Sequence, residues 1–105
     1  MKPLTESTYL VMLALYNDPL HGYGIIKMIE RISEGNLIIA PGTLYGILSN
    51  LEKQKLIKAW KEELDSRKKK TYTLTEKGKQ VFQEEFNRYQ KMVSFTERII
   101  EQREK

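Results

Sequence analysis

One stretch, Pro41 to Leu74, joins a helical pattern to a basic hairpin pattern, and this combination most limits what the chain can fold into. Within its first part, the apolar residues Leu44, Ile47, Leu48 and Leu51 recur at helical spacing. That spacing predicts an amphipathic helix with a single buried stripe.

The other side chains of this predicted helix are small, polar or able to hydrogen-bond. At about 100° per residue, they fall on the face opposite the stripe and on its flanks. They are Gly42, Thr43, Tyr45, Gly46, Ser49, Asn50 and Lys53. A helix that lies against the edges of bases needs a face of this kind.

A two-stranded hairpin is expected directly after the helix, with strands at residues 57–62 and 70–74. Asp65 and Ser66 are turn formers, and four adjacent cations, Arg67 to Lys70, follow them. Residues 53–80 carry ten Lys and Arg against four Asp and Glu, which is a net charge of +6. Such a concentration favours phosphate binding, although a solvated basic hairpin kept for solubility is the alternative.

Two aromatic residues of the hairpin leave alternatives open. Strict alternation places Ile57 and Ala59 on one face and Trp60 on the other. Trp60 can cover the sheet or stack on a ligand. Tyr72 can pack under the hairpin or contact a phosphate.

The N-terminal half predicts two more helices, at residues 5–17 and 22–33, and a brief strand at 37–40. His21 is the only histidine, and the chain has no cysteine, so a metal site is not expected. No nucleophile, paired carboxylates or phosphate-binding loop accompanies it, which argues against an enzyme.

The C-terminal segment predicts one helix from Thr75 to about Glu104, roughly 45 Å long. Phe82, Phe86, Tyr89 and Val93 follow one another at spacings of four, three and four residues. A small domain cannot cover so long an apolar face, and an uncovered face indicates an interface, here a two-fold dimer. The alternative is a helix folded back wholly onto its own domain.

We therefore expect a mainly α protein with a small β-hairpin, organised as a winged helix-turn-helix domain (residues 1–76) and a dimerisation helix (residues 77–105). Neither a membrane span nor a signal peptide is expected, which favours a cytoplasmic location. Two-fold symmetry would space the half-sites of an inverted-repeat operator about 34–36 Å apart on double-stranded DNA. The candidate DNA-binding residues are Thr43, Tyr45, Gly46, Ser49, Asn50, Lys53, Arg67, Lys68, Lys69, Lys70 and Tyr72.

Three motifs carry a resemblance to a known family. GTLYGILSNLEKQKLI, the basic hairpin and KTYTLTEKG together resemble the PadR family of bacterial transcriptional regulators, and HGYGIIKMI is similar to the family's second helix. The resemblance covers roughly residues 4–80. One departure is that Leu64, Asp65 and Ser66 stand where family wings commonly carry a glycine.

The resemblance implies a repressor of the smaller subgroup, with a single C-terminal dimerisation helix and no cofactor. Some relatives respond to phenolic acids, drugs or other flat hydrophobic effectors in a cavity between subunits. Carried onto this chain, the interface or cavity residues would be Tyr9, Leu13, Phe82, Phe86, Tyr89 and Val93. A closed dimer core is the alternative to the cavity. A winged helix that grips an acidic protein, without specific DNA binding, is the alternative function.

Overall fold

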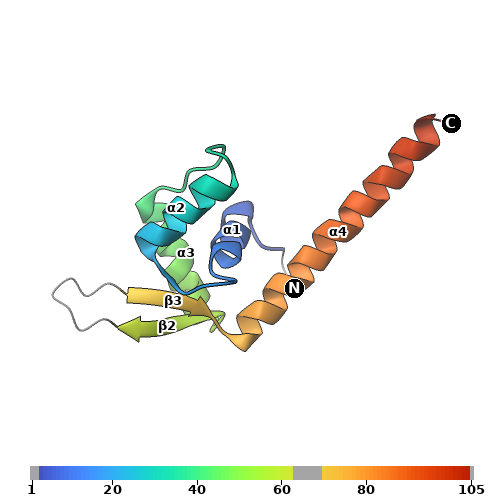
Figure 1. The fold of residues 1–105 in the computed structure, drawn as a ribbon. Coiled ribbons are helices and arrows are strands. Elements are labelled where there is room, and N and C mark those ends of the chain that lie inside the picture. The colour runs from blue at the N-terminus through green and yellow to red at the C-terminus, as the bar shows by residue number, and fades with distance from the viewer. Residues whose placement is uncertain (1–2, 63–69, 105) are drawn as a thin grey trace.

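Helices and a small antiparallel sheet alternate along the chain in the computed structural model, which describes residues 3–62 and 70–104. The elements are α1 (Glu6–Ala14), β1 (Leu20–His21), α2 (Gly22–Ile32), α3 (Pro41–Lys53), β2 (Ile57–Glu62), β3 (Lys70–Leu74) and α4 (Glu76–Glu104). Figure 1 shows α1, α2 and α3 gathered on one side of the sheet. The winged helix with a long C-terminal helix is confirmed.

Local hydrogen bonds explain where three helices begin. The Thr5 hydroxyl accepts from the Thr8 N–H at 3.1 Å and caps α1. Nδ1 of His21 accepts from the Gly24 N–H at 3.1 Å, so this histidine caps α2. The Thr75 hydroxyl accepts from Gly78 at 3.0 Å at the start of α4.

The third strand of the sheet is β1, not the expected segment 37–40. The strand order is β1-β3-β2, and Leu20 pairs with Tyr72 while His21 pairs with Thr71. The 37–40 segment is otherwise engaged, because the Leu37 N–H donates to the Ser33 hydroxyl at 3.0 Å and that hydroxyl donates to the Leu37 carbonyl at 3.3 Å. The expected strand was therefore wrong.

A single apolar core joins the three short helices to the inner face of the sheet and the start of α4. Its fully buried members include Met12 of α1, Ile25 of α2 and Leu44 of α3. Ile57 and Leu74 contribute from the two wing strands. Burial of these side chains fixes which face of α3 is left to solvent.

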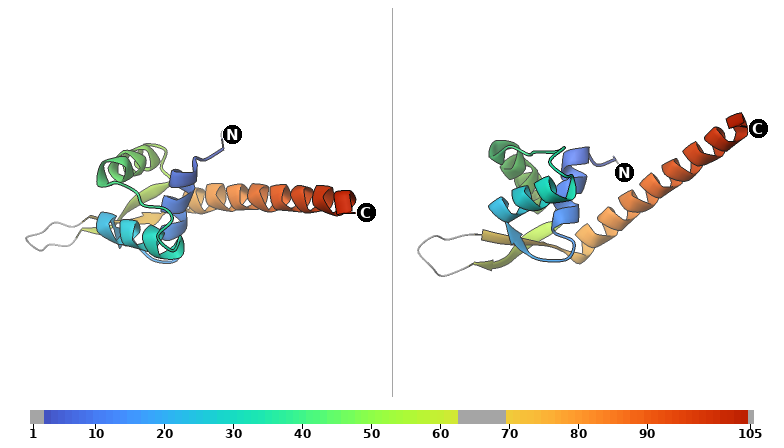
Figure 2. Two further views of the ribbon diagram at one scale, coloured as in Figure 1. Left: turned by 90° about the horizontal axis from the view of Figure 1, so that it is seen from above. Right: turned by 45° about the horizontal axis from the view of Figure 1, so that its top comes forward.

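Beyond this core, α4 continues as a projecting rod. The chain measures 64 × 29 × 21 Å along its principal axes. Both views in Figure 2 show the distal part of α4 extending away from the other elements. In the part of the chain that the structure describes, no helix is long and apolar enough to cross a membrane.

Candidate nucleic-acid interface

The orientation of α3 agrees with the sequence pattern. Leu44, Leu48 and Leu51 are at most 1% exposed. The predicted polar face is exposed throughout, at Gly42, Thr43, Tyr45, Gly46, Ser49, Asn50 and Lys53. A Cβ added at Gly42 or Gly46 would meet no atom within 4 Å, so another molecule can approach the backbone there closely.

Tyr45 lies over the start of α2. Its hydroxyl oxygen occupies the space where a Cβ on Gly22 would be, 2.7 Å from that position. Tyr45 is still 55% exposed. The glycine thus allows a large, half-exposed tyrosine to sit where α2 and α3 meet.

The wing strand β3 is joined to α3 by an ion pair. Nζ of Lys70 lies 3.1 Å from Oε2 of Glu52, and both side chains remain partly exposed. The same ammonium lies 5.4 Å from the centre of the Tyr72 ring. Sequence reasoning missed Glu52, because nothing local links two residues that lie 18 positions apart.

Tyr72 is buried, at 7% exposed. Burial raises its pKa, and the nearby Lys70 ammonium opposes this shift. Of the two roles left open by the sequence, the structure supports packing under the wing rather than contact with phosphate. Arg67, Lys68 and Lys69 lie outside the described residues.

Trp60 occupies an irregularity of β2. Ala59 pairs with Tyr72 and Lys61 with Thr71, so Trp60 is an extra residue in the ladder, which is a β-bulge. The pairing is regular from Ile57 to Ala59, so the bulge breaks the expected alternation only from Trp60 onward. Ala59 shares a face with Ile57 but is exposed, whereas Ile57 is buried. The Trp60 side chain is 57% exposed.

Aromatic side chains join α1 to the first half of α4. The Tyr9 ring stacks on Phe82 and meets Tyr89 edge-on, each at 4.8 Å between ring centres. The centre of the Tyr16 ring lies 5.2 Å from the centre of the Phe82 ring. Phe82, predicted to line an interface, is only 6% exposed and packs within its own chain.

The other predicted interface residues differ in exposure. Tyr9 and Tyr89 are half-buried, whereas Leu13 and Phe86 are about two-fifths exposed, at 37% and 40%. Val93 is 58% exposed. Further along α4 lie more exposed apolar side chains, namely Met92, Phe95, Ile99 and Ile100.

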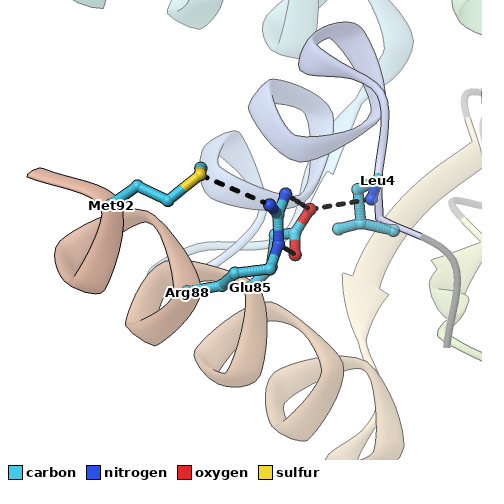
Figure 3. Close-up of polar contacts among 4 residues, drawn as sticks. All are labelled: Leu4, Glu85, Arg88 and Met92. Carbon is cyan, nitrogen blue, oxygen red and sulfur yellow. Dashed lines mark hydrogen bonds and ion pairs between the residues drawn. The ribbon is translucent and has the colours of Figure 1, made fainter. Parts of the chain in front are cut away.

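A buried carboxylate that the sequence did not single out lies beside this aromatic group. Glu85 accepts from the backbone N–H of Leu4 at 2.7 Å and from Nε of Arg88 at 2.8 Å (Figure 3). The hydrogen bond from Arg88 lowers the pKa of Glu85, against the opposing effect of burial and with help from the Leu4 N–H. Glu85 therefore stays ionised at neutral pH.

The polar face of α3 and the neighbouring wing form the candidate binding surface. Among residues 3–62 and 70–104, no group of three or more His, Cys, Asp or Glu side chains could hold a metal ion. What the structure presents is a small polar helix face next to a wing. Residues 11–84 match the family described as "Transcriptional regulator PadR-like family".

The chain belongs to the PadR-like family. Members of this family are transcriptional regulators, not enzymes. A relative, the transcriptional regulator YqjI of Escherichia coli K12, is 38% identical over 79 residues, which are 75% of this chain and 37% of YqjI. The chain thus spans little more than a third of that relative's length.

Several solved structures share this fold. A PadR-like transcription factor from Bacteroides fragilis is 29% identical, with a TM-score of 0.74 over 89% of this chain and 88% of that one. Bacillus subtilis PadR in complex with operator DNA has a TM-score of 0.69 at 24% identity, over 80% and 48% of the two chains. Bordetella bronchiseptica BpsR, whose DNA binding is regulated by 6-hydroxynicotinic acid, has a TM-score of 0.63 at 24% identity, over 94% and 64%.

Proposed function

We propose that this PadR-like chain is a dimeric repressor that binds an inverted-repeat operator. Each α3 would enter a major groove, and each wing would contact the neighbouring backbone. The observation that carries the proposal is the orientation of α3. Its leucines are buried, while Ser49, Asn50 and Lys53 lie on an open face.

The charge distribution supports the same partner. Residues 53–80 hold a net charge of +6, whereas residues 1–52 hold a net charge of −2. Lys53 at the end of α3 and Lys58 in the wing strand β2 are both exposed. Cations of this kind gain affinity by releasing counterions from duplex DNA. Because the partner is chromosomal DNA, we also infer a cytoplasmic location.

The distal half of α4 supports dimerisation. Val93, Phe95, Ile99 and Ile100 are each more than half exposed. Val93 and Ile100 share one side of α4, and Phe95 and Ile99 share another. Apolar surface left uncovered on both sides indicates an interface. The simplest partner is a second copy related by a two-fold axis. The division into a DNA-binding domain (residues 1–76) and a dimerisation helix (residues 77–105) follows from this proposal.

A mobility-shift assay on the promoter of the chain's own gene tests the proposal directly. The wild type should shift this duplex in preference to an unrelated one of equal length. A variant with Arg67 to Lys70 neutralised should bind more weakly and show a flatter dependence on salt. Equal binding to all duplexes by the wild type would instead favour a protein-binding winged helix.

An effector is a second proposal, supported by the half-buried Tyr9 and Tyr89 and the partly exposed Phe86. Flat aromatic molecules stack well on such rings. BpsR provides a precedent in the same fold. Titrating the protein with flat aromatic dyes, with and without operator, distinguishes an effector site from a closed dimer core.

A further inference from the structure

Glu85 is the only charged residue that is buried among those whose side chains the structure describes, at 7% exposed. Both carboxylate oxygens are engaged. Oε1 accepts from Nε of Arg88 at 2.8 Å, while Oε2 accepts from Nη2 of Arg88 at 3.0 Å and from the Leu4 N–H at 2.7 Å. Figure 3 shows the carboxylate between α4 and the N-terminal segment. A buried charge is costly unless it is fully paired, so this arrangement depends on all three bonds.

The location of these bonds matters because α4 is supported over only part of its length. Gly78 packs on the backbone of Leu56 at its start, and Phe82 and Tyr89 contact Tyr9. From Met92 onward the apolar side chains are exposed. The distance from Glu85 to the end of the helix is about 28 Å at 1.5 Å per residue. A rotation of about 10° at Glu85 would therefore move that end by roughly 5 Å relative to the domain.

Apolar packing alone leaves such a rotation poorly restrained. The aromatic contacts are short-ranged but tolerate sliding, because burial of apolar surface has no preferred direction. Charge-assisted hydrogen bonds do have one, and their strength falls steeply when they bend. The Leu4 bond joins α4 to the segment just before α1, whereas the hydroxyl of the neighbouring Thr5 is used as the cap of α1.

The same N-terminal segment also borders the proposed DNA-binding helix. Leu4 and Thr5 line a groove of about 250 Å³ together with Leu51 and Asn50 of α3. Asn50 is one of the residues expected to face the bases. The segment thus lies between α4 on one side and α3 on the other.

We propose that Glu85 is a positioning residue that fixes the angle between α4 and the DNA-binding domain. In a dimer held through α4, this angle sets the separation of the two α3 helices, and hence the half-site spacing that the protein accepts. The inference rests on the proposed dimeric DNA-binding function.

The first experiment measures DNA binding by Glu85→Gln, with Glu84→Gln as the matched control. Glu84 is the exposed neighbour, so both variants lose one negative charge from the same turn of α4. An operator selected from random duplexes is lengthened or shortened at its centre by one to three base pairs. Wild type and Glu84→Gln should lose at least tenfold in affinity for a one-base-pair change. Glu85→Gln should lose less than about threefold, with affinity for a single half-site within twofold of wild type. Identical spacing profiles for all three proteins would overturn the proposal.

The second experiment reads the angle without DNA. The chain has no cysteine, so Lys27→Cys on α2 and Glu101→Cys on α4 accept spin labels at two exposed positions only. Labelled chains are mixed with an excess of unlabelled chains, so that each dimer carries labels on one chain at most. The distribution of distances between the two labels within that chain is then measured. Glu85→Gln should broaden or shift it, and Glu84→Gln should not. An unchanged distribution would overturn the proposal.

A third variant removes the partner of the carboxylate instead of the carboxylate itself. Arg88→Gln keeps the bond between Glu85 and Leu4 but removes both bonds from the guanidinium. The Glu85 carboxylate would then be buried with the Leu4 N–H as its one remaining partner of the three, so the distribution should broaden or shift at least as much as in Glu85→Gln. A changed distribution in a protein that shows no sequence-specific DNA binding would support the positioning role while overturning the proposed function.

Discussion

The Lys70 ammonium and the Glu52 carboxylate, 3.1 Å apart, join the wing to the helix proposed to read bases. Lys70 is a candidate phosphate ligand. In the structure its ammonium is paired with the Glu52 carboxylate, which is negatively charged like a phosphate. When DNA binds, Lys70 must exchange one anion for another. We therefore expect Glu52 to lower the affinity for any duplex, specific or not.

Replacement of Glu52 by Gln should tighten DNA binding. An exposed ion pair contributes at most about 1 kcal/mol, so we expect a gain of roughly two- to fivefold. The salt dependence of binding should change by less than about one unit, because Lys70 meets a phosphate in the complexes of both proteins. Fluorescence anisotropy on operator and random duplexes measures both quantities. Weaker binding by Glu52→Gln, with Glu84→Gln unchanged, would mean that the ion pair positions the wing instead.

A Gly22→Ala change should reduce operator affinity with little effect on stability. Its Cβ would lie 2.7 Å from the Tyr45 hydroxyl oxygen, so the end of that side chain must move. The free energy of unfolding should change by less than about 1 kcal/mol, since a side-chain end yields easily and alanine favours a helix. The matched control is Gly24→Ala, whose nearest contact is an ordinary 3.4 Å. Equal operator affinities in the two variants would show that Tyr45 does not contribute to binding.

Gly78→Ala should destabilise the protein strongly. A Cβ there would collide with the backbone carbonyl of Leu56, which is itself held by the Thr75 N–H at 3.0 Å. Because a backbone atom cannot yield as a side chain does, we expect a loss of about 3 kcal/mol or more. Thermal unfolding should be compared at equal protein concentration. Gly46→Ala, in open space on α3, should instead gain up to about 1 kcal/mol.

Glu85 should make stability depend on acid pH. Its pKa is lowered from 4.5 in the folded chain, first by the Arg88 hydrogen bond and also by the Leu4 N–H. The carboxylate therefore contributes stability above about pH 4.5, and this contribution is lost as the pH falls through the lower folded-state pKa. Urea unfolding of Glu85→Gln should show a smaller loss between neutral and acid pH than wild type. An equally steep acid decline would contradict this assignment.

A charge in the distal part of α4 should separate the subunits. Val93 is 58% exposed and does not belong to the core, so Val93→Glu should leave each domain folded. Sedimentation at micromolar concentration should change from dimer to monomer, because a buried, unpaired charge is costly at an interface. Lys91→Glu, on an exposed position two residues away, is the control. A wild type that sediments as a monomer would remove the basis for the dimer.

The sequence by itself determined the local elements and their exposed faces. Helical spacing of Leu44, Leu48 and Leu51 predicted both α3 and its polar face, and the long apolar pattern predicted α4. These predictions succeed because residues three or four apart on a helix share a face wherever the helix is placed. The sequence also predicted that Phe82, Phe86 and Tyr89 share one face of α4. Phe82, however, is covered by Tyr9 of its own chain.

Only the tertiary structure decided which distant residues meet. The pairing of Leu20 with Tyr72, the ion pair of Glu52 with Lys70 and the bond from Leu4 to Glu85 join residues separated by 18 to 81 positions. No local periodicity carries that information, since such contacts depend on how the core brings whole elements together. For the same reason the bulge at Trp60 broke the alternation that the sequence predicted. The spacing of apolar residues determines which face of each helix is exposed, and the packing of distant segments determines how the helices and strands are oriented relative to one another.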